Sequence, residues 1–233
     1  MGAVFKREMK AYFSSPLGYV ILAVMILFSG IFFVYMYGFG FGDIGYIFSS
    51  QFTVIMFVVP VLTMRLFSEE RKYKTDQALF TAPVGLYSVV LGKFFAAFAL
   101  FAAGFLPTLI YELVLTSKIT VNWLLYICYL LGVSLYSAAL IAIGVFVSSL
   151  TESQVVAAVA SLFVSIFIAL MDSIAQMLEG TFLNKIFTSI SFVGRYETFA
   201  NGILDFSNIL FFLSVTGLFI FFTVRALERK RWA

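Results

Sequence analysis

The hydrophobic pattern of this chain consists of long apolar runs separated by short polar or glycine-rich breaks. Cutting the sequence at these breaks predicts six helices, each near the ~20 residues that a bilayer requires. The predicted helices cover residues 17–37, 51–67, 88–113, 122–147, 154–172 and 207–226. The runs are continuous rather than alternating, which disfavours a transmembrane β-barrel. We therefore expect an all-α, polytopic membrane protein with one transmembrane domain over residues 1–233.

Residues 1–13 have an amphipathic pattern. Apolar side chains recur there at helical spacing, with charged residues between them, at Phe5, Met9, Tyr12 and Phe13. This pattern predicts a helix that lies on the membrane interface. The apolar run that follows is too long for a signal peptide and lacks a cleavage-site pattern, so a retained helix is favoured over a cleaved leader.

A strongly charged stretch follows the second predicted span. Arg65 to Asp76 holds seven of the 27 charged residues of the chain, of which 15 are basic and 12 acidic. At roughly 3 kcal/mol per charge at mid-bilayer, this stretch cannot span the membrane and must form a polar elbow between two spans. Thr75 suits an N-cap, Asp76 the positive end of a helix and Pro83 a stop, which predicts a short surface helix over residues 77–82. Arg65 and Glu69 are four residues apart, so we expect them to pair.

Two further local features carry predictions. Pro60 removes one backbone hydrogen bond and should bend the second span before Arg65. Residues 148–152 form a tight turn between the fourth and fifth spans, where capping of the fifth helix by Thr151 is favoured over pairing of Glu152 with a basic partner. The longest segment outside the spans, residues 173–206, has apolar residues at helical spacing and predicts short amphipathic helices in the outer leaflet, or a plain structured loop. The apolar positions are Leu178, Phe182, Ile186, Ile190 and Val193.

The distribution of basic residues predicts the orientation. With both termini in the cytoplasm, twelve of the fifteen basic residues lie on the inner side, and only Lys118, Lys185 and Arg195 lie outside. We therefore expect a multi-pass protein of the cytoplasmic cell membrane, with both termini cytoplasmic. The basic ends favour anionic membrane lipids as partners, whereas nucleic acid is disfavoured because the chain has no soluble basic domain.

Composition excludes several kinds of chemistry. The chain has no histidine and a single cysteine, Cys128, so a zinc site, a Cys-His nucleophile and a disulfide framework are excluded. Gly85 to Lys93 is not a phosphate-binding loop, because six residues separate its glycines, Phe94 follows the lysine and no strand precedes it. We expect no catalytic, cofactor-binding or metal-binding residue on this chain, so any energy must come from a partner.

The elbow also resembles a known family. EERKYKTDQALFTAPVGLYSVVLGK is similar to the cytoplasmic loop of ABC type-2 permeases, whose pattern is roughly E-[RK]-x-x-G-T, a short helix, P-[VL] and a closing G-K. Thr75, Pro83, Gly92 and Lys93 are in register, and Lys74 stands where the family usually has glycine. Three more segments resemble the branch associated with gliding motility: SSPLGYV at 14–20, SSLTESQVVA at 148–157 and RYETFANGILD at 195–205.

The resemblance implies the permease subunit of an ABC exporter. It implies a second permease copy or paralogue, a separate ABC ATPase subunit that carries ATP and Mg, an interface helix near that ATPase, and a re-entrant outer element in residues 173–206. The ATPase would dock on the elbow at residues 69–83, with contacts at Glu69, Glu70, Arg71, Lys72, Thr75, Asp76, Leu79, Phe80 and Pro83. Two alternatives remain open. An ion-coupled secondary transporter should show inverted repeats and broken helices, and a lipid-modifying enzyme should show a carboxylate cluster, whereas Glu112 and Asp172 both lie near span ends.

Overall fold

The computed structural model describes most of the chain as helices joined by short turns. The described residues are 1–39, 44–75, 85–117, 122–177 and 190–231, and none of them forms a strand. In chain order the helices are α1 (Gly2–Ser14), α2 (Pro16–Gly38), α3 (Gly45–Thr63), α4 (Arg65–Lys72), α6 (Leu86–Phe105), α7 (Pro107–Leu115), α8 (Trp123–Leu150), α9 (Gln154–Met177), α11 (Val193–Ala200) and α12 (Phe206–Arg231). The predicted all-α architecture is confirmed for this part of the chain.

Within the described residues, six helical segments are long and apolar enough to cross a membrane, as the hydrophobic pattern predicts. α2, α8, α9 and α12 each form one segment. α3 and α4 together form another, Gly45–Lys72, and α6 with α7 form Leu86–Leu115. The sequence therefore located all six segments, with boundaries that differ by a few residues, and the chain is a multi-pass membrane protein.

The outer helices of the bundle expose apolar side chains over most of their length. Only 22% of the apolar window of α2, 28% of that of α9 and 22% of that of α12 is buried, against 72% for α8. The exposed side chains of α9 recur along one face, at Val155, Val159, Phe163, Phe167 and Leu170. An apolar surface of this extent is stable in bilayer hydrocarbon and not in water.

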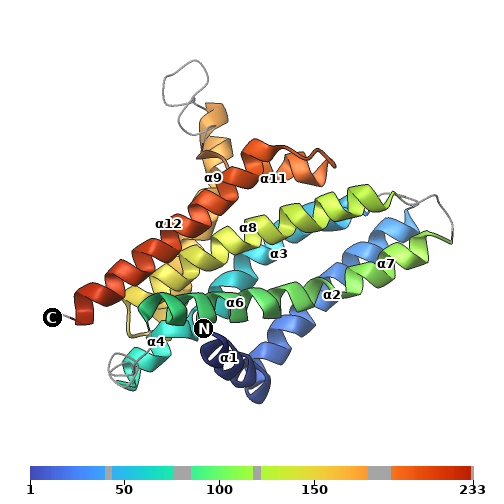
Figure 1. The fold of residues 1–233 in the computed structure, drawn as a ribbon. Coiled ribbons are helices and arrows are strands. Elements are labelled where there is room, and N and C mark those ends of the chain that lie inside the picture. The colour runs from blue at the N-terminus through green and yellow to red at the C-terminus, as the bar shows by residue number, and fades with distance from the viewer. Residues whose placement is uncertain (40–43, 76–84, 118–121, 178–189, 232–233) are drawn as a thin grey trace.

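α8 lies at the centre of the bundle, in contact with α3, α6, α9, α11 and α12 (Figure 1). Two of its glycines allow this close packing. A Cβ atom on Gly144 would lie 2.2 Å from Thr63 Oγ1 of α3, and one on Gly132 would lie 2.4 Å from Phe199 Cβ of α11. Small residues at helix contacts let backbones approach closely in membrane proteins. Gly132 and Gly144 of the fourth span therefore serve packing within the chain.

Two of the long segments are interrupted at or near prolines. α3 and α4 are separated at Met64, four residues after Pro60, so the interruption lies where the bend was predicted. α6 ends at Phe105, and Pro107 occupies the first turn of α7, a position where its missing N–H costs no helical hydrogen bond.

The turn between α8 and α9 corrects one prediction. Ser153, immediately before the first residue of α9, accepts a hydrogen bond on its hydroxyl from the Val156 backbone N–H at 3.4 Å. The hydroxyl of Thr151 instead accepts from Ser153 N at 3.2 Å, inside the turn. The cap of the fifth span is therefore Ser153 and not Thr151, because the N-cap is the residue that adjoins the first helical turn.

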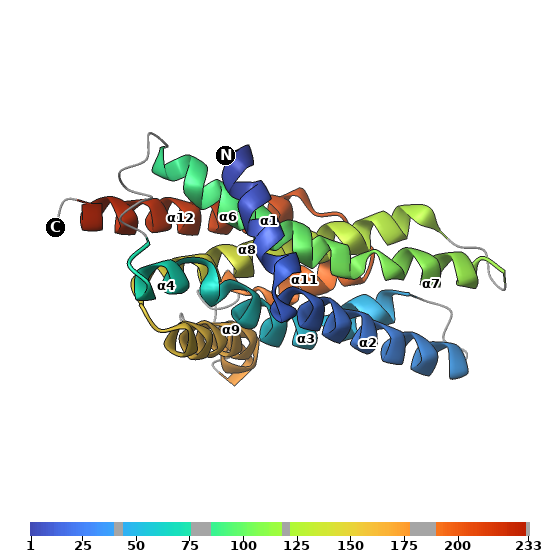
Figure 2. The same ribbon diagram turned by 90° about the horizontal axis from the view of Figure 1, so that it is seen from below.

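The start of α1 and the end of α12 lie toward the same end of the bundle (Figures 1 and 2). α1, α4, the start of α6 and the last turns of α12 gather there, and α1 crosses α6 (Figure 2). These elements carry most of the basic residues, and we refer to this end as the charged end. The other end, where α11 lies, is the opposite end.

The predicted outer segment is described in part. α9 continues to Met177, beyond the predicted boundary at residue 172, and α11 lies within the segment. Tyr196 and Phe199 of α11 are buried, and α11 packs against α8 and α3. The apolar positions Leu178, Phe182 and Ile186 lie outside the described residues. A re-entrant outer element therefore stays a prediction.

Candidate functional site

Four charged side chains from three helices meet at the charged end. Lys93 of α6 lies with its Nζ 3.1 Å from Glu8 Oε1 of α1 and 3.0 Å from Glu70 Oε1 of α4. Arg7 of α1 contacts the same two carboxylates, at 2.8 Å from Glu8 and 2.5 Å from Glu70. We call these four residues the charge junction. It joins α1, α4 and α6.

Lys93 is the buried member of the charge junction, with a side chain that is 1% exposed. Besides the two carboxylates, its ammonium donates a hydrogen bond to the Leu66 carbonyl at 2.5 Å and lies 5.0 Å from the centre of the Phe67 ring. A buried ammonium is tolerated only when its charge is balanced and its protons are bonded. The three oxygen acceptors meet this requirement.

The charges of the junction shift the proton affinity of its α1 members. Burial alone would raise the pKa of the Glu8 carboxyl, but the charge of Lys93 and hydrogen bonds from Arg7 and Lys93 hold that pKa below its usual value. Burial would lower the pKa of Arg7, yet its bonds and attraction to Glu8 and Glu70 raise it. Both groups therefore stay ionised at neutral pH, and the opposite charges of the junction balance.

Gly92 explains how α1 approaches α6 closely enough for these ion pairs. A Cβ atom at this position would lie 2.9 Å from Val4 Cβ and 3.2 Å from the Met1 carbonyl oxygen. A larger residue would push α1 away from α6. The Gly92–Lys93 pair therefore has a structural role: the glycine lets α1 approach α6, and the lysine binds α1 through Glu8.

The apolar residues predicted for the interface helix do not all share one environment. Tyr12 is 1% exposed, and its hydroxyl donates to the Leu62 carbonyl at 3.0 Å. Burial raises the pKa of this hydroxyl, so it remains a donor. Phe5 and Met9 are half-buried against the core, whereas Phe13 is 39% exposed and contacts Tyr19 edge-on. Most of the apolar face of α1 thus packs on protein.

α4 is fastened to α8 through the hydroxyl of Ser148. This hydroxyl accepts hydrogen bonds from the backbone N–H groups of Phe67 at 3.1 Å and Ser68 at 3.2 Å, and it donates to the Met64 carbonyl at 3.0 Å. The first N–H groups of a helix have no partner within that helix. A serine of another span therefore performs the capping of α4.

Ser149, the next residue of α8, receives bonds from two basic side chains. Its carbonyl accepts from Arg71 of α4 at 2.9 Å and from Lys230 of α12 at 2.9 Å. Arg71 also lies 3.7 Å from Glu152, so the glutamate has a basic partner, which was the less favoured of the two roles considered for this turn. The end of α8 is thereby tied to both the elbow and the last span.

The start of α4 shows the predicted local pair. Arg65 Nε lies 3.3 Å from Glu69 Oε2, and the guanidinium donates a second bond to the Ser15 hydroxyl at 2.9 Å. The same group lies over the Tyr12 ring, 5.6 Å from its centre. Arg65 therefore connects the elbow to the junction of the first two helices.

α4 ends in a Schellman motif whose geometry involves Lys74. The backbone N–H of Lys74 donates to the Arg71 carbonyl at 3.1 Å, and the N–H of Thr75 donates to the Glu70 carbonyl at 2.9 Å. Lys74 has a positive φ of 56°, and it is the only residue other than glycine with a positive φ among the described residues. Lys74 thus adopts the conformation that glycine favours, at the position where ABC type-2 permeases usually have glycine.

The structure brings some of the predicted contact residues together and leaves others apart. Glu70 and Arg71 point into the protein, with side chains 17% and 14% exposed, while Lys72 is exposed beside the Tyr73 ring. The Thr75 hydroxyl donates back to the Glu70 carbonyl at 3.2 Å. The remaining predicted contacts, Asp76, Leu79, Phe80 and Pro83, lie outside the described residues, as does the predicted helix 77–82.

A cavity of about 330 Å³ opens between α1 and α4 beside the charge junction. Its walls include Arg65, Glu69, Tyr73 and Thr75 together with the junction residues. The cavity wall therefore carries charges of both signs. Within the described residues, no group of three or more His, Cys, Asp or Glu side chains could hold a metal ion.

Sequence reasoning did not place Glu8, Lys93, Ser148 and Ser149 in the candidate site. The sequence feature that could have pointed to Lys93 was the Gly92–Lys93 pair. We noted that this pair matches the closing G-K of the family pattern, but we assigned it no role. The contacts of Lys93 join residues 85 and 27 positions apart along the chain, and no local spacing reports them.

Comparisons with known proteins leave the family open. A scan against models of protein families finds no match, and a search of curated proteins finds no significant match. The function is therefore argued from the sequence pattern and from the geometry above.

Proposed function

We propose that this chain is the membrane-spanning permease subunit of an ABC exporter. It would work as a pair with a second copy or a paralogue, in the cytoplasmic membrane, with both termini and the charged end in the cytoplasm. A separate ATPase subunit would bind ATP and Mg and dock on the elbow. The resemblance of the elbow and of three other segments to ABC type-2 permeases, including a gliding-motility branch, supports this proposal.

One observation carries the proposal: the elbow is bonded to several spans at once. α4 is held by Ser148 and Ser149 of α8, by Lys93 of α6 and, through Glu70, by Arg7 of α1. Lys230 of α12 binds the same Ser149 carbonyl that Arg71 of α4 binds. If the elbow moved while these helices stayed in place, all of these bonds would have to break. A displacement of the elbow would therefore move the helices with it.

In this mechanism the chain transmits motion and performs no chemistry of its own. Closure of the ATPase subunits on ATP would push the elbows, and the connected helices would rock between inward-open and outward-open arrangements. Lys72, Tyr73, Lys74 and Thr75 are exposed and belong to the surface that such a subunit would meet. The ion pairs of the charge junction would hold α4 to α1 and α6 during this movement.

The proposal is tested at the apolar pair of the elbow, Leu79 and Phe80. Apolar anchors in a groove usually dominate docking energy, so the double variant Leu79→Ala/Phe80→Ala should insert normally but retain ~10-fold less ATPase. The measurement is co-purification of an ATP-hydrolysing subunit with the tagged chain from native membranes, together with the ATPase activity of the complex. A matched control is Leu113→Ala/Val114→Ala, an exposed apolar pair of α7.

The control variant should retain ATPase like the native chain. Equal ATPase recovery with the elbow variant would exclude the elbow as the docking contact. If the native chain is isolated without any ATPase and is active alone, the exporter proposal fails in favour of an ion-coupled transporter or a lipid-modifying enzyme.

A further inference from the structure

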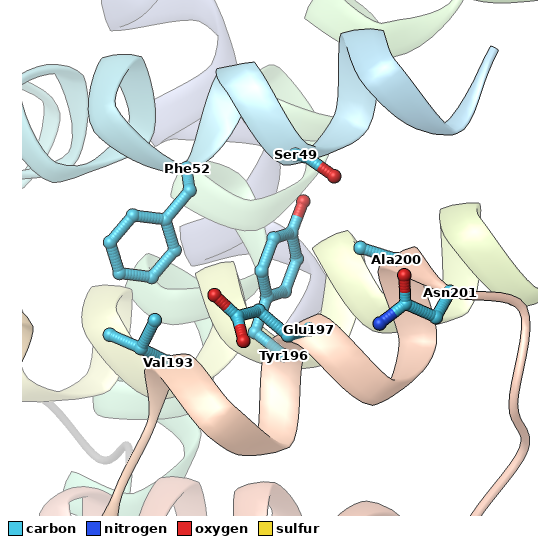
Figure 3. Close-up of a pocket in the computed structure, with 7 residues that line it drawn as sticks. All are labelled: Ser49, Phe52, Val193, Tyr196, Glu197, Ala200 and Asn201. Carbon is cyan, nitrogen blue, oxygen red and sulfur yellow. The ribbon is translucent and has the colours of Figure 1, made fainter. Parts of the chain in front are cut away.

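A second cavity, of about 390 Å³, lies at the opposite end between α3 and α11 (Figure 3). Its α11 wall consists of Val193, Tyr196, Glu197, Ala200 and Asn201, which recur at the spacing of one helix face. Ser49 and Phe52 of α3 form the facing wall. The volume lies in the range of small-molecule sites.

The aromatic part of this cavity is held rigidly. The Tyr196 hydroxyl donates to the Phe48 carbonyl of α3 at 2.5 Å, so its ring is fixed against that helix. The Phe52 ring is stacked on Tyr136 with ring centres 4.8 Å apart and lies 5.6 Å from the Tyr196 ring. A wall that is ordered before binding loses little entropy when a ligand arrives.

The cavity carries a net negative charge. Glu197 is exposed, and in Figure 3 its carboxylate extends on the Phe52 side of Tyr196, while Ser49 and Asn201 lie on the other side. Among the described residues Glu197 has no ion-pair partner, and no basic side chain lines the cavity. Arg195 belongs to another face of α11, where it donates to Asn208 Oδ1 at 2.7 Å and lies 4.4 Å from the centre of the Phe211 ring.

We propose that this cavity binds an organic ammonium group. A carboxylate attracts the positive charge, and neighbouring aromatic rings stabilise a cation through their π electrons, a combination that recognises alkylammonium ligands. Ser49 and Asn201 supply hydrogen bonds for a polar substituent of the same ligand. The inference uses only the geometry of this cavity, so it holds or fails independently of the exporter proposal.

Choline and its uncharged isostere 3,3-dimethyl-1-butanol are suitable probes, because they differ in charge and hardly in shape. Both are titrated by NMR against the full-length chain in a maltoside detergent, which carries no ammonium group. The native chain should bind choline at least ~10-fold more tightly than the isostere. Glu197→Gln should abolish most of that preference, and Phe52→Leu should weaken choline binding several-fold. Glu152→Gln, which removes a 72%-exposed carboxylate at the charged end, is the matched control and should bind choline like the native chain.

Equal binding of choline and the isostere, or unchanged choline binding by Glu197→Gln, overturns the proposal. Variants are compared only at equal melting temperature, so that loss of binding does not reflect unfolding. A lipid headgroup and a soluble amine can both supply the ammonium group, and nanodiscs separate these sources. Discs of equal phosphatidylglycerol content are compared, so that surface charge is the same, with either phosphatidylethanolamine or a neutral glycolipid as the second lipid. Weaker choline binding in the phosphatidylethanolamine discs supports a headgroup in the cavity, whereas equal binding supports a soluble amine.

Discussion

At the scale of single residues, Lys74 occupies a backbone conformation that suits glycine better than lysine. Its φ of 56° brings the Cβ atom close to the backbone, a strain of about 1 kcal/mol that glycine avoids. We expect Lys74→Gly to stabilise the protein by up to about 1 kcal/mol, partly offset by the greater freedom of glycine in the unfolded chain. The measurement is the midpoint of thermal unfolding in detergent.

Lys72→Gly is the matched control, since it makes the same chemical change two residues earlier, in the last turn of α4. Glycine in a helix costs up to about 1 kcal/mol, so this variant should melt lower. If both variants lower the midpoint alike, the strain attributed to position 74 is absent.

Lys93 should be hard to replace alone and easier to replace with its partners. Lys93→Met leaves Glu8 and Glu70 mostly buried, with side chains 13% and 17% exposed and one cation fewer between them. Breaking a buried ion pair from one side costs about 3–5 kcal/mol, whereas removing all of its charges is often near neutral. Adding Glu8→Gln and Glu70→Gln removes the other two buried charges and leaves Arg7, whose side chain is 53% exposed, to water. We therefore expect this triple variant to regain much of the melting temperature that Lys93→Met loses. A single variant that melts at or above the triple variant would contradict a charge-balanced junction.

At the scale of helices, the contact of α8 with α3 depends on one missing methyl group. Gly144→Ala would place a Cβ atom 2.2 Å from Thr63 Oγ1, so the two helices would have to separate. Overpacking of this kind costs typically about 1–3 kcal/mol. Gly217→Ala of α12 is the control, because its Cβ atom would meet nothing within 4 Å and alanine favours the helix. Thermal unfolding should show a lower midpoint for the first variant only, and equal midpoints would mean that α3 and α8 yield easily.

The helices themselves could be predicted from the sequence because their cause is local. An apolar run of membrane length specifies a span by itself, and a pair such as Arg65 and Glu69 is set by helical spacing. The candidate site could be predicted only where it is local, as in the charged elbow. Its ion pairs depend on which distant helices meet, and the docking of α1 on Gly92 of α6 has no signature within either segment. The cap of α9 was misassigned because Thr151 and Ser153 are chemically alike, and only the backbone geometry separates them.

At the scale of the whole molecule, the charge distribution predicts which end faces the cytoplasm. After Cys128→Ser, single cysteines are placed at Asp43, Glu179 and Lys72, and intact cells are treated with an impermeant thiol reagent. Cysteines at 43 and 179 should react and the one at 72 should not, because basic loops are retained inside. Lysed cells, in which all three positions should react, provide the control. Reaction at position 72 alone would show that the protein has the opposite orientation in the membrane.

The bonds of Ser148 determine how a force on the elbow would spread. α3 and α4 are consecutive in sequence but separated at Met64, while the first turn of α4 is capped by a side chain of α8. A force on α4 therefore reaches α8 through the Ser148 hydroxyl, and not only α3, which precedes α4 in the sequence. We expect a force applied at Lys72 and Tyr73 to rotate α8. Of the six long apolar segments among the described residues, α8 is the most deeply buried. α12, which packs on α8 and donates to the Ser149 carbonyl through Lys230, would then move with it.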